Sequence, residues 1–437
     1  MLPAAVNGIA KLPTTVGPMR ARVLIVSAVA AAAALTPAAP ASALTNGVQI
    51  ANLSKGQSPA YLRQQLDAAK DLGADLVRTE VTWAALEPDA SGRRDPAYLA
   101  LLDGFMADTK SRGLRVLFTF EGTPCWASSA PDDIRSACDA RAQTWPPTDP
   151  HDYAEAAGFL AARYGARLTA IEIWNEPDHQ NEFYFAGPDK PTRYAAILKA
   201  AYPAIKAASP QTQVLAGSLV GANGAFLSAL YAAGIKGSYD ALSVHYYDIV
   251  LGSLRTIRQV MKAHGDSSPV WLSEFGWTSC SPQRTQGGHA CVSKVEEGRS
   301  LQDIYASLKH TSWVDAAITY NMADFTQYDF GLIDVHGNRK PAFAALQRVF
   351  MGHGPPVRSV KLRLRRSGGR LVASGSGPAG DDLELDAFRG GRQLYKAVFR
   401  LDRRSRYSLR LPGQLGTSGL RVRVYQYWTG RSASATA

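Results

Sequence analysis

The sequence predicts an α/β protein: a (β/α)8 TIM barrel followed by a small antiparallel β domain. Three observations support this fold class. Short apolar or β-branched runs alternate with longer amphipathic stretches from Gly47 onward, which is typical of strands alternating with helices. Eight such runs precede Phe350, and eight strands close a parallel barrel. After Gly352 apolar and charged residues alternate, which indicates antiparallel strands.

The first 43 residues have the composition of an export signal. Arg20 and Arg22 precede the apolar run Val23–Leu35, and a Pro/Ala-rich stretch then ends at Ala41-Ser42-Ala43. This order of charged, apolar and small-residue segments predicts a signal peptide cleaved near Ala43, and therefore a secreted protein. Met19 is an alternative start site. A membrane anchor is the competing interpretation, but the apolar run is short for a bilayer span.

The barrel domain is expected to span residues 44–351. Its predicted strands are Gly47–Ala51, Leu76–Val81, Arg115–Phe120, Ala170–Trp174, Gln213–Gly217, Ala241–Tyr246, Val270–Ser273 and Ala317–Tyr320. Its predicted helices are Pro59–Leu72, Ala97–Arg112, Asp152–Tyr164, Thr192–Ala208, Leu251–His264, Lys294–His310 and Pro341–Phe350. An open doubly wound sheet is the alternative. That fold often has a glycine-rich phosphate loop after its first strand, and Gly47–Ser54 contains none.

Four cysteines, Cys125, Cys138, Cys280 and Cys291, form two local pairs in loop-like stretches. In an exported chain two disulfides are the natural expectation. Pairing Cys125 with Cys138 and Cys280 with Cys291 closes the shortest loops. A zinc site is the alternative, but no C-x-x-C occurs and no histidine has suitable spacing. We therefore predict two disulfides and no metal.

The basic charge is concentrated in the tail of the chain. We expect a linker at residues 352–357 and a basic β-sandwich-like accessory domain at 358–437. From Pro356 onward there are 17 Lys/Arg and 5 Asp/Glu, whereas Leu44–Pro355 has 28 and 32. Such a basic face suggests contact with an acidic polymer or the cell envelope, and a solvated outer face is the alternative. Nucleic acid is not expected as a partner of an exported protein.

Two glutamates follow strands that would end on the active face of a barrel. Glu176 lies in Ile173-Trp174-Asn175-Glu176-Pro177 after the fourth strand. Glu274 lies in Leu272-Ser273-Glu274-Phe275-Gly276-Trp277 at the end of the seventh. Catalytic residues of such barrels lie at these strand ends. Retaining cleavage of a glycosidic bond needs one protonated and one ionised carboxyl group in one cavity, which two glutamates on different strands could supply.

The W-N-E-P and S-E-F-G-W motifs resemble those of the clan A glycoside hydrolases, which include cellulase-like and β-xylosidase-like families. The resemblance spans about Gly47 to Phe350. It implies that Glu176 is the general acid/base and that Glu274 is the nucleophile. It also implies that Asn175 binds the sugar 2-hydroxyl.

Two other strand ends fit the same clan. Leu76-Val77-Arg78-Thr79-Glu80 resembles its second strand, so Arg78 is expected to stabilise the nucleophile as a carboxylate. Ser243-Val244-His245-Tyr246-Tyr247 resembles the H-x-Y of its sixth strand. The resemblance implies that His245 borders the substrate and that Tyr247 hydrogen-bonds Glu274.

The eighth strand departs from the clan pattern. Members usually have a tryptophan platform there, whereas this chain reads Ile318-Thr319-Tyr320-Asn321-Met322. Tyr320 or Met322 is the expected substitute. Trp126 and Trp277 are further candidates for stacking on sugar rings near the cleft.

The sequence therefore predicts a secreted, monomeric retaining glycoside hydrolase that needs no cofactor and cleaves O-glycosidic bonds of a polysaccharide or oligosaccharide. Two alternatives stay open. One is a non-catalytic carbohydrate-binding barrel. The other is a transglycosylase that uses the same two carboxylates.

Overall fold

The computed structural model describes residues 44–221, 223–247, 253–280, 285–286, 288–309, 311–325, 327–353, 359–377, 382–401, 405–426 and 432–437. The predicted signal peptide (1–43) and most of the predicted linker therefore lie outside the described residues. Within these ranges, no helix is both long and apolar enough to cross a membrane.

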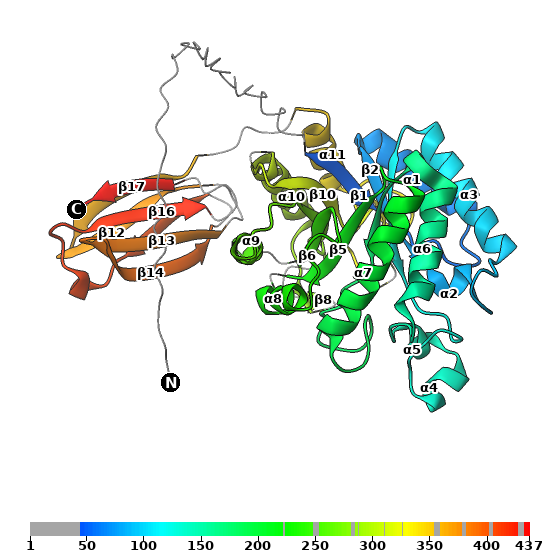
Figure 1. Ribbon diagram of the computed structural model, residues 1–437. Helices are drawn as coiled ribbons and strands as arrows, with labels where there is room; N and C mark the ends of the chain where they lie inside the picture. The colour runs from blue at the N-terminus through cyan, green and yellow to red at the C-terminus, as the bar shows by residue number, and fades with distance from the viewer. Residues whose placement is uncertain are drawn as a thin grey trace, which may run out of the picture. The chain divides into compact units, whose positions relative to one another are not determined.

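Residues 44–353 form a closed barrel of eight parallel strands, in the spatial order β1-β10-β7-β6-β5-β4-β3-β2 (Figure 1). The strands are β1 (Thr45–Gln49), β2 (Leu76–Thr82), β3 (Arg115–Glu121), β4 (Leu168–Ile173), β5 (Gln213–Val220), β6 (Ala241–Tyr247), β7 (Val270–Gly276) and β10 (Val314–Thr319). All eight predicted strands are present, with ends that differ by a few residues. The predicted barrel fold is confirmed.

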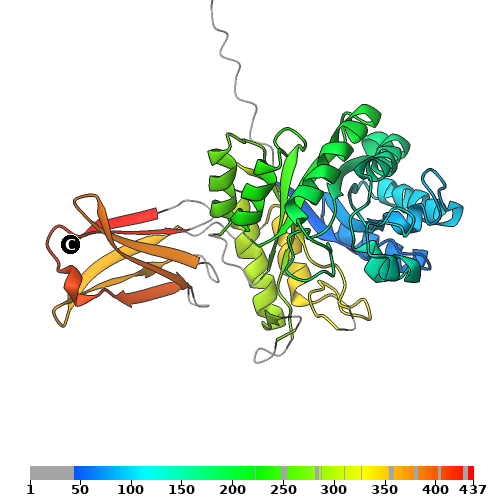
Figure 2. The same ribbon diagram turned by 60° about the horizontal axis from the view of Figure 1, so that its bottom comes forward.

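Helices surround the strands (Figure 2). They are α1 (Pro59–Leu72), α2 (Trp83–Leu86), α3 (Pro96–Ser111), α4 (Asp132–Ala137), α5 (Ala140–Gln143), α6 (Pro150–Tyr164), α7 (Lys190–Ala208), α8 (Gly224–Ala232), α9 (Ser253–Ala263), α10 (Lys294–Leu308) and α11 (Pro341–Phe350), with a 3-10 turn η1 (Gly165–Arg167). The seven predicted helices are among them, and α2, α4, α5 and α8 were not predicted. The sequence of α8 is almost entirely apolar and gives no amphipathic pattern.

Helix α1 illustrates how the sequence sets an element's limits. The Ser58 hydroxyl oxygen accepts a hydrogen bond from the Tyr61 N–H, and Pro59 occupies the first turn. Gly73 ends the helix with φ of 82°, a left-handed conformation that glycine adopts without steric cost. Leu62 and Leu66, four residues apart, lie on the buried face.

The barrel interior has an apolar lower layer and a polar upper layer. The lower layer is a buried cluster made of Leu76, Leu117, Ala170, Leu215, Ala241, Trp271, Ala316 and Ile318. Alternate residues of a strand face the same side. Two residues beyond Leu76, Leu117 and Ala170 come Arg78, Thr119 and Glu172, which are all fully buried. The strand period therefore brings polar groups inward at the carboxyl ends of β2, β3 and β4.

The tail forms an antiparallel β domain with its own small core, as predicted. One sheet has the order β11-β12-β15 and the other the order β14-β13-β16-β17. The strands are β11 (Lys361–Ser367), β12 (Arg370–Ser376), β13 (Asp382–Arg389), β14 (Arg392–Arg400), β15 (Arg406–Arg410), β16 (Arg421–Gln426) and β17 (Ser432–Thr436), with a 3-10 turn η2 (Gly413–Leu415). Apolar side chains of both sheets form the core.

Candidate active site

Arg78 on β2 is the central cation of the site. Its Nη1 donates to Oε1 of Glu274, and its Nη2 donates to Asn175 Oδ1 at 3.0 Å. Its Nε and Nη2 also donate to Glu172 Oε2 at 2.9 and 2.7 Å. Burial opposes the charge, but Glu172 and Glu274 outweigh it and raise the Arg78 pKa. The guanidinium thus stays charged and holds three strand ends together.

Glu274, near the end of β7, has a donor on each carboxylate oxygen. Arg78 donates to Oε1 and the Tyr247 hydroxyl donates to Oε2. The side chain is buried, with 5% of the residue exposed. These two donors fix the orientation of the carboxylate. This arrangement suits a nucleophile.

Glu176 lies just beyond β4 in an unusual backbone turn. Trp174 has φ of 67° and Glu176 has φ of 44°, a region that non-glycine residues adopt rarely. The Ser218 hydroxyl on β5 stabilises the turn: it donates to the Trp174 carbonyl at 3.1 Å and accepts from the Glu176 N–H at 3.2 Å. Such strain is typical of functional sites. No motif in the sequence pointed to Ser218.

His245 on β6 lies between the two glutamates. Its Nδ1 is 2.8 Å from Glu176 Oε1 and 3.5 Å from Glu274 Oε2. Burial lowers the His245 pKa, but the two carboxylates outweigh burial and the net shift is upward. Burial raises the Glu176 pKa, but the His245 hydrogen bond and charge outweigh that effect, so the pKa is below its usual value. The imidazole therefore controls the charge of Glu176.

The two carboxylates lie close enough to act on one bond. A carboxylate oxygen of Glu176, a ring nitrogen of His245 and a carboxylate oxygen of Glu274 all lie within 4.8 Å of one another. Among the described residues this trio is also the one group that could hold a metal ion. Hydrogen bonds within the site already engage its atoms: His245 Nδ1 with Glu176, and Arg78 and Tyr247 with Glu274.

Glu172 belongs to the supporting layer below the cleft. Its Oε2 accepts from Arg78 and from the Thr119 hydroxyl, the latter at 2.7 Å. Burial would raise its pKa, but the Arg78 charge and these hydrogen bonds lower it to about 2. A carboxylate ionised so firmly is a fixed counter-charge for Arg78 rather than a proton donor.

Two further carboxyl groups, Glu80 and Glu121, lie near the strand ends of β2 and β3. Burial raises the Glu80 pKa to about 7, with Glu274 adding to the rise and Arg78 opposing it. The Glu121 pKa is raised well above its usual range by burial and by the charge of Glu80. Both residues are partly exposed. The site is therefore rich in carboxyl groups, and each added negative charge is costly there.

Three aromatic side chains, Tyr247, Tyr320 and Phe330, form a cluster that we call the aromatic wall. It lies where clan members usually have the tryptophan of the eighth strand. The Tyr320 ring packs edge-on against Tyr247 and Phe330, with centroids 5.7 and 5.6 Å apart. Tyr320 is partly exposed, whereas Met322 is fully buried. Of the two expected substitutes, the structure therefore leaves only Tyr320 with a face open to a ligand.

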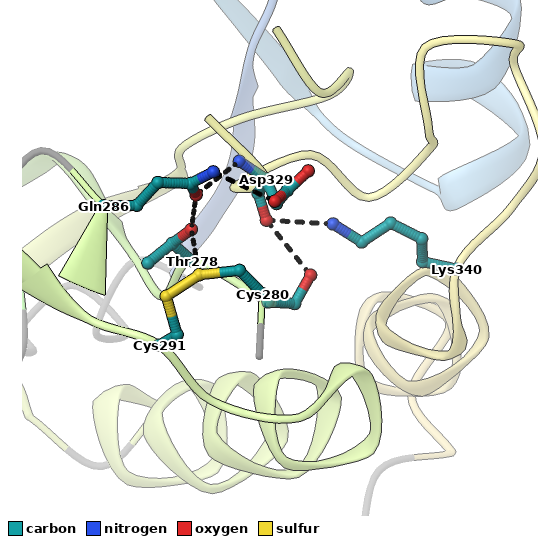
Figure 3. Close-up of a disulfide and its surroundings, with 7 residues drawn as sticks. Thr278, Cys280, Gln286, Cys291, Asp329 and Lys340 are labelled. Carbon is teal, nitrogen blue, oxygen red and sulfur yellow. Dashed lines mark hydrogen bonds between the residues drawn. A yellow bond between two sulfur atoms is a disulfide. The ribbon is translucent and has the colours of Figure 1, made fainter. Parts of the chain in front are cut away.

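Both predicted disulfides are present, Cys125–Cys138 and Cys280–Cys291. The second closes the loop after β7, which contains β8 (Thr285–Gln286) and β9 (His289–Ala290). Figure 3 shows Gln286 of this loop pointing toward Asp329. Gln286 Nε2 donates to Asp329 Oδ2 at 3.0 Å, and Lys340 Nζ donates to the Asp329 carbonyl at 3.0 Å.

The same loop reaches the aromatic wall. The His289 ring lies 5.0 Å from that of Tyr247 and 5.6 Å from that of Phe330, centroid to centroid. Tyr247 in turn donates to Glu274. The disulfide loop therefore packs directly behind Tyr247, the hydrogen-bond donor of Glu274.

The two predicted tryptophan subsites are placed differently from expectation. Trp277 is 3% exposed and belongs to the main apolar core, so its ring has no open face for a sugar. Trp126 is partly exposed, but its ring packs edge-on against Trp83 and its Nε1 donates to the Glu87 carbonyl at 2.8 Å. The stacking prediction is wrong for Trp277, because its ring is buried within the apolar core.

The closed barrel with paired glutamates at strand ends defines the class of glycoside hydrolases. The family model for cellulase (glycosyl hydrolase family 5) matches residues 42–312. The chain belongs to this family and is a glycosidase that acts on O-glycosyl compounds. A search of curated protein sequences finds no match.

Solved structures share the fold at low sequence identity. A family 39 glycoside hydrolase from Bacteroides cellulosilyticus WH2 is 18% identical, with a TM-score of 0.55 over 85% of this chain and 81% of that one. A monomeric β-xylosidase from Caulobacter crescentus CB15 is 14% identical, with a TM-score of 0.52 over 85% and 95%. An exo-β-1,4-mannosidase from Opitutaceae bacterium strain TAV5 is 16% identical, with a TM-score of 0.53 over 71% and 60%.

Proposed function

We propose that this chain is a retaining glycosidase with Glu274 as nucleophile and Glu176 as general acid/base. The observation that carries the proposal is that ligand atoms of the two carboxylates lie within 4.8 Å of each other. Retaining enzymes place the two carboxyl groups about 5–5.5 Å apart, whereas inverting enzymes need about 6.5–9.5 Å to admit a water molecule. The short separation supports direct attack by a carboxylate.

The reaction proceeds in two displacements. A Glu274 oxygen attacks the anomeric carbon while Glu176 donates its proton to the departing oxygen, and the C–O bond breaks. Glu176, now ionised, takes a proton from water, which attacks the same carbon and releases Glu274. Arg78 and Tyr247 orient the nucleophile throughout, and Asn175, held by Arg78, is placed beside it. Two inversions return the original anomeric configuration.

The charges around the cleavage site restrict the sugar that binds there. Glu80, Glu121 and Glu274 lie close enough for their charges to raise the pKa values of Glu80 and Glu121. A uronic acid at the cleavage position would add another buried negative charge to this group. We therefore infer that the sugar between Glu176 and Glu274 is uncharged or carries an amino group. Tyr320 supplies the apolar ring on which one sugar face rests.

The proposal is tested with Glu176→Ala and Glu274→Ala on a panel of polysaccharides and aryl β-glycosides. Both variants are expected to lose most hydrolysis, of the order of a thousandfold or more, because each removes one of two mutually dependent groups. Glu121→Ala is the matched control, since it removes a third cleft carboxyl group without removing either reacting group.

Added azide distinguishes the two roles. The Glu176→Ala enzyme can still form the glycosyl–Glu274 ester, so azide should yield a glycosyl azide with the configuration of the substrate. The Glu274→Ala enzyme has a vacant position where azide replaces the carboxylate, so the product should be inverted. Hydrolysis at the wild-type rate in either variant, or the reverse pattern of azide products, would refute the assignment.

We further propose that the enzyme is secreted and monomeric. Export is supported by the signal-like residues 1–43 and by the two disulfides, which persist in oxidising compartments. Mass spectrometry of the protein from culture medium should show an N-terminus near Leu44. An intact N-terminus found only inside cells would contradict export.

A further inference from the structure

The sheet β11-β12-β15 of the tail domain has one apolar and one polar face. Leu362 and Leu364 of β11 and Tyr407 and Leu409 of β15 pack with the domain core. Because side chains alternate along a strand, the residues between them lie on the opposite, outer face.

The register aligns the outer residues in rows across the three strands. The rows are Lys361–Ser376–Arg406, Arg363–Ser374–Ser408, Arg365–Val372–Arg410 and, at the end of the sheet, Ser367–Arg370. Basic residues thus occupy both outer strands, and serines line much of the middle strand. We call the six cations Lys361, Arg363, Arg365, Arg370, Arg406 and Arg410 the basic face.

The dimensions of a sheet give the spacing of these charges. Strands lie about 4.8 Å apart, so β11 and β15 are separated by roughly 10 Å across β12. Residues on the same face of a strand are roughly 6.8 Å apart. The basic face is therefore a strip with cations along both sides, serine hydroxyls between them, and Arg370 on the middle strand at one end.

In the part of the chain that the structure describes, no carboxylate pairs with the charges of the basic face. All six side chains are exposed, and no carboxylate stands among the rows. Among the described residues none of the six forms an ion pair. The described ion pairs of this domain, Lys396–Glu384 and Arg423–Asp386, belong to the other sheet. Like charges held this close repel one another, and a bound polyanion would relieve that repulsion.

In the third row of the basic face, the buried Val372 lies between Arg365 and Arg410. The apolar stems of long basic side chains can cover such a residue while their charged ends stay in water. The side-chain stems of Arg365 and Arg410 therefore flank one apolar residue within the strip.

We propose that the basic face binds an acidic polysaccharide whose carboxylates pair with the cations and whose hydroxyls meet the serines. Guanidinium groups recognise carboxylates through paired hydrogen bonds. The rows contain no aromatic residue, whereas surfaces for single-stranded nucleic acid stack bases on aromatic rings. A glycan is also the class of polymer on which this enzyme family acts.

This site goes beyond the proposed catalysis and recognises a different sugar. The cleft is rich in carboxyl groups and disfavours a uronic acid, whereas the basic face attracts one. The inferred role is attachment of the enzyme to an acidic polymer, or to the acidic units of a mixed polymer, while the cleft cuts at an uncharged or amino sugar.

The test is binding of the full chain to polygalacturonate, with uncharged dextran, duplex DNA and phosphatidylglycerol vesicles as comparison probes. The face variant is Arg363→Gln/Arg365→Gln/Arg410→Gln. The control variant is Arg348→Gln/Arg392→Gln/Arg421→Gln, which removes three equally exposed charges from other surfaces. Circular dichroism and hydrolysis of an aryl glycoside establish that both variants are folded.

Wild-type protein should bind polygalacturonate in low salt more tightly than the other probes, and weaken as salt screens the charges. The face variant should bind roughly tenfold or more weakly, from three contacts of up to about 1 kcal/mol each. The control variant should stay within about twofold of wild type. Equal loss in both variants, no loss in the face variant, or equal or tighter binding to DNA or vesicles would overturn the proposal.

Discussion

At the scale of single residues, His245 lowers the pKa of Glu176, the proposed general acid. Its hydrogen bond and charge lower the pKa of Glu176 despite burial. A general acid must hold its proton in the free enzyme, and a lowered pKa restricts that form to acidic pH. We therefore expect kcat/KM to fall with rising pH already on the acidic side of neutrality. Because Glu176 and His245 titrate together, the pH of this alkaline limb reports the pair rather than either residue alone.

Replacing His245 with glutamine should move that limb to higher pH. The substitution removes the positive charge that lowers the pKa of Glu176, while burial, which raises the pKa, remains. The pH dependence of kcat/KM on an aryl glycoside measures the shift. His151→Gln is the control, because His151 is exposed on α6 and its partner is Asp149. An alkaline limb that stays in place or moves downward would contradict this account of His245.

At the scale of elements, the loop closed by Cys280–Cys291 packs behind Tyr247, which donates to the proposed nucleophile Glu274. His289 of this loop packs on Tyr247, which donates to Glu274. Cys280→Ser/Cys291→Ser should lower the free energy of unfolding by about 3 kcal/mol, the value typical of a loop of this length. It should also lower kcat, because the support behind Tyr247 is loosened.

The first disulfide provides the matched comparison. Cys125 and Cys138 are 13 residues apart in sequence, against 11 for the second pair. None of the described hydrogen bonds or ring contacts joins residues 125–138 to Glu176, Glu274 or Tyr247. Cys125→Ser/Cys138→Ser should therefore lose similar stability in urea unfolding with a smaller effect on kcat. Equal kcat losses in the two variants would show that the second loop has no special role.

Helix α10 contains a buried acid that links stability to pH. Burial raises the pKa of Glu297 to about 8, although Lys340 opposes the rise. The folded state therefore holds a proton that the unfolded chain releases above its ordinary pKa. Stability from this group is complete at low pH and falls as the pH rises toward about 8.

Glu297→Gln should remove this loss. The free energy of unfolding, measured by urea titration between pH 5 and 8, should decline less in the variant than in wild type, by about 1 kcal/mol or more. Glu296→Gln, on the same helix but partly exposed, should leave the slope unchanged. A parallel decline in Glu297→Gln and wild type would mean that Glu297 is ionised in the folded protein.

At the scale of the whole molecule, hydrophobic periodicity was sufficient to predict the barrel. All eight strands alternate with helices in a regular order, so each was visible locally. The tail strands β12 and β17 lack a clear hydrophobic pattern of their own. β12 ends in the serine- and glycine-rich Ser374-Gly375-Ser376, and β17 is built of serine, alanine and threonine. Such strands are specified by pairing with neighbours rather than by their own pattern.

The candidate site was predictable where a residue lies at or just beyond a strand end. The strand-end motifs predicted that six residues share one site: Arg78, Asn175, Glu176, His245, Tyr247 and Glu274. Ser218 was not predicted, because its hydroxyl supports a turn on a neighbouring strand and leaves no local signal. Trp277 was misjudged because motif proximity does not say which way a ring points. The packing of the barrel, which the sequence does not reveal, leaves Tyr320 partly exposed and buries Met322.

If Glu274 attacks the anomeric carbon directly, the first product keeps the anomeric configuration of the substrate. Proton NMR of a β-glycoside during its hydrolysis resolves the two anomers before they interconvert. With Glu274 as nucleophile, the β-anomer should appear first and the α-anomer should follow by mutarotation. Initial release of the α-anomer would show that water displaces the leaving group in one step, and would contradict the assignment of Glu274 as the nucleophile.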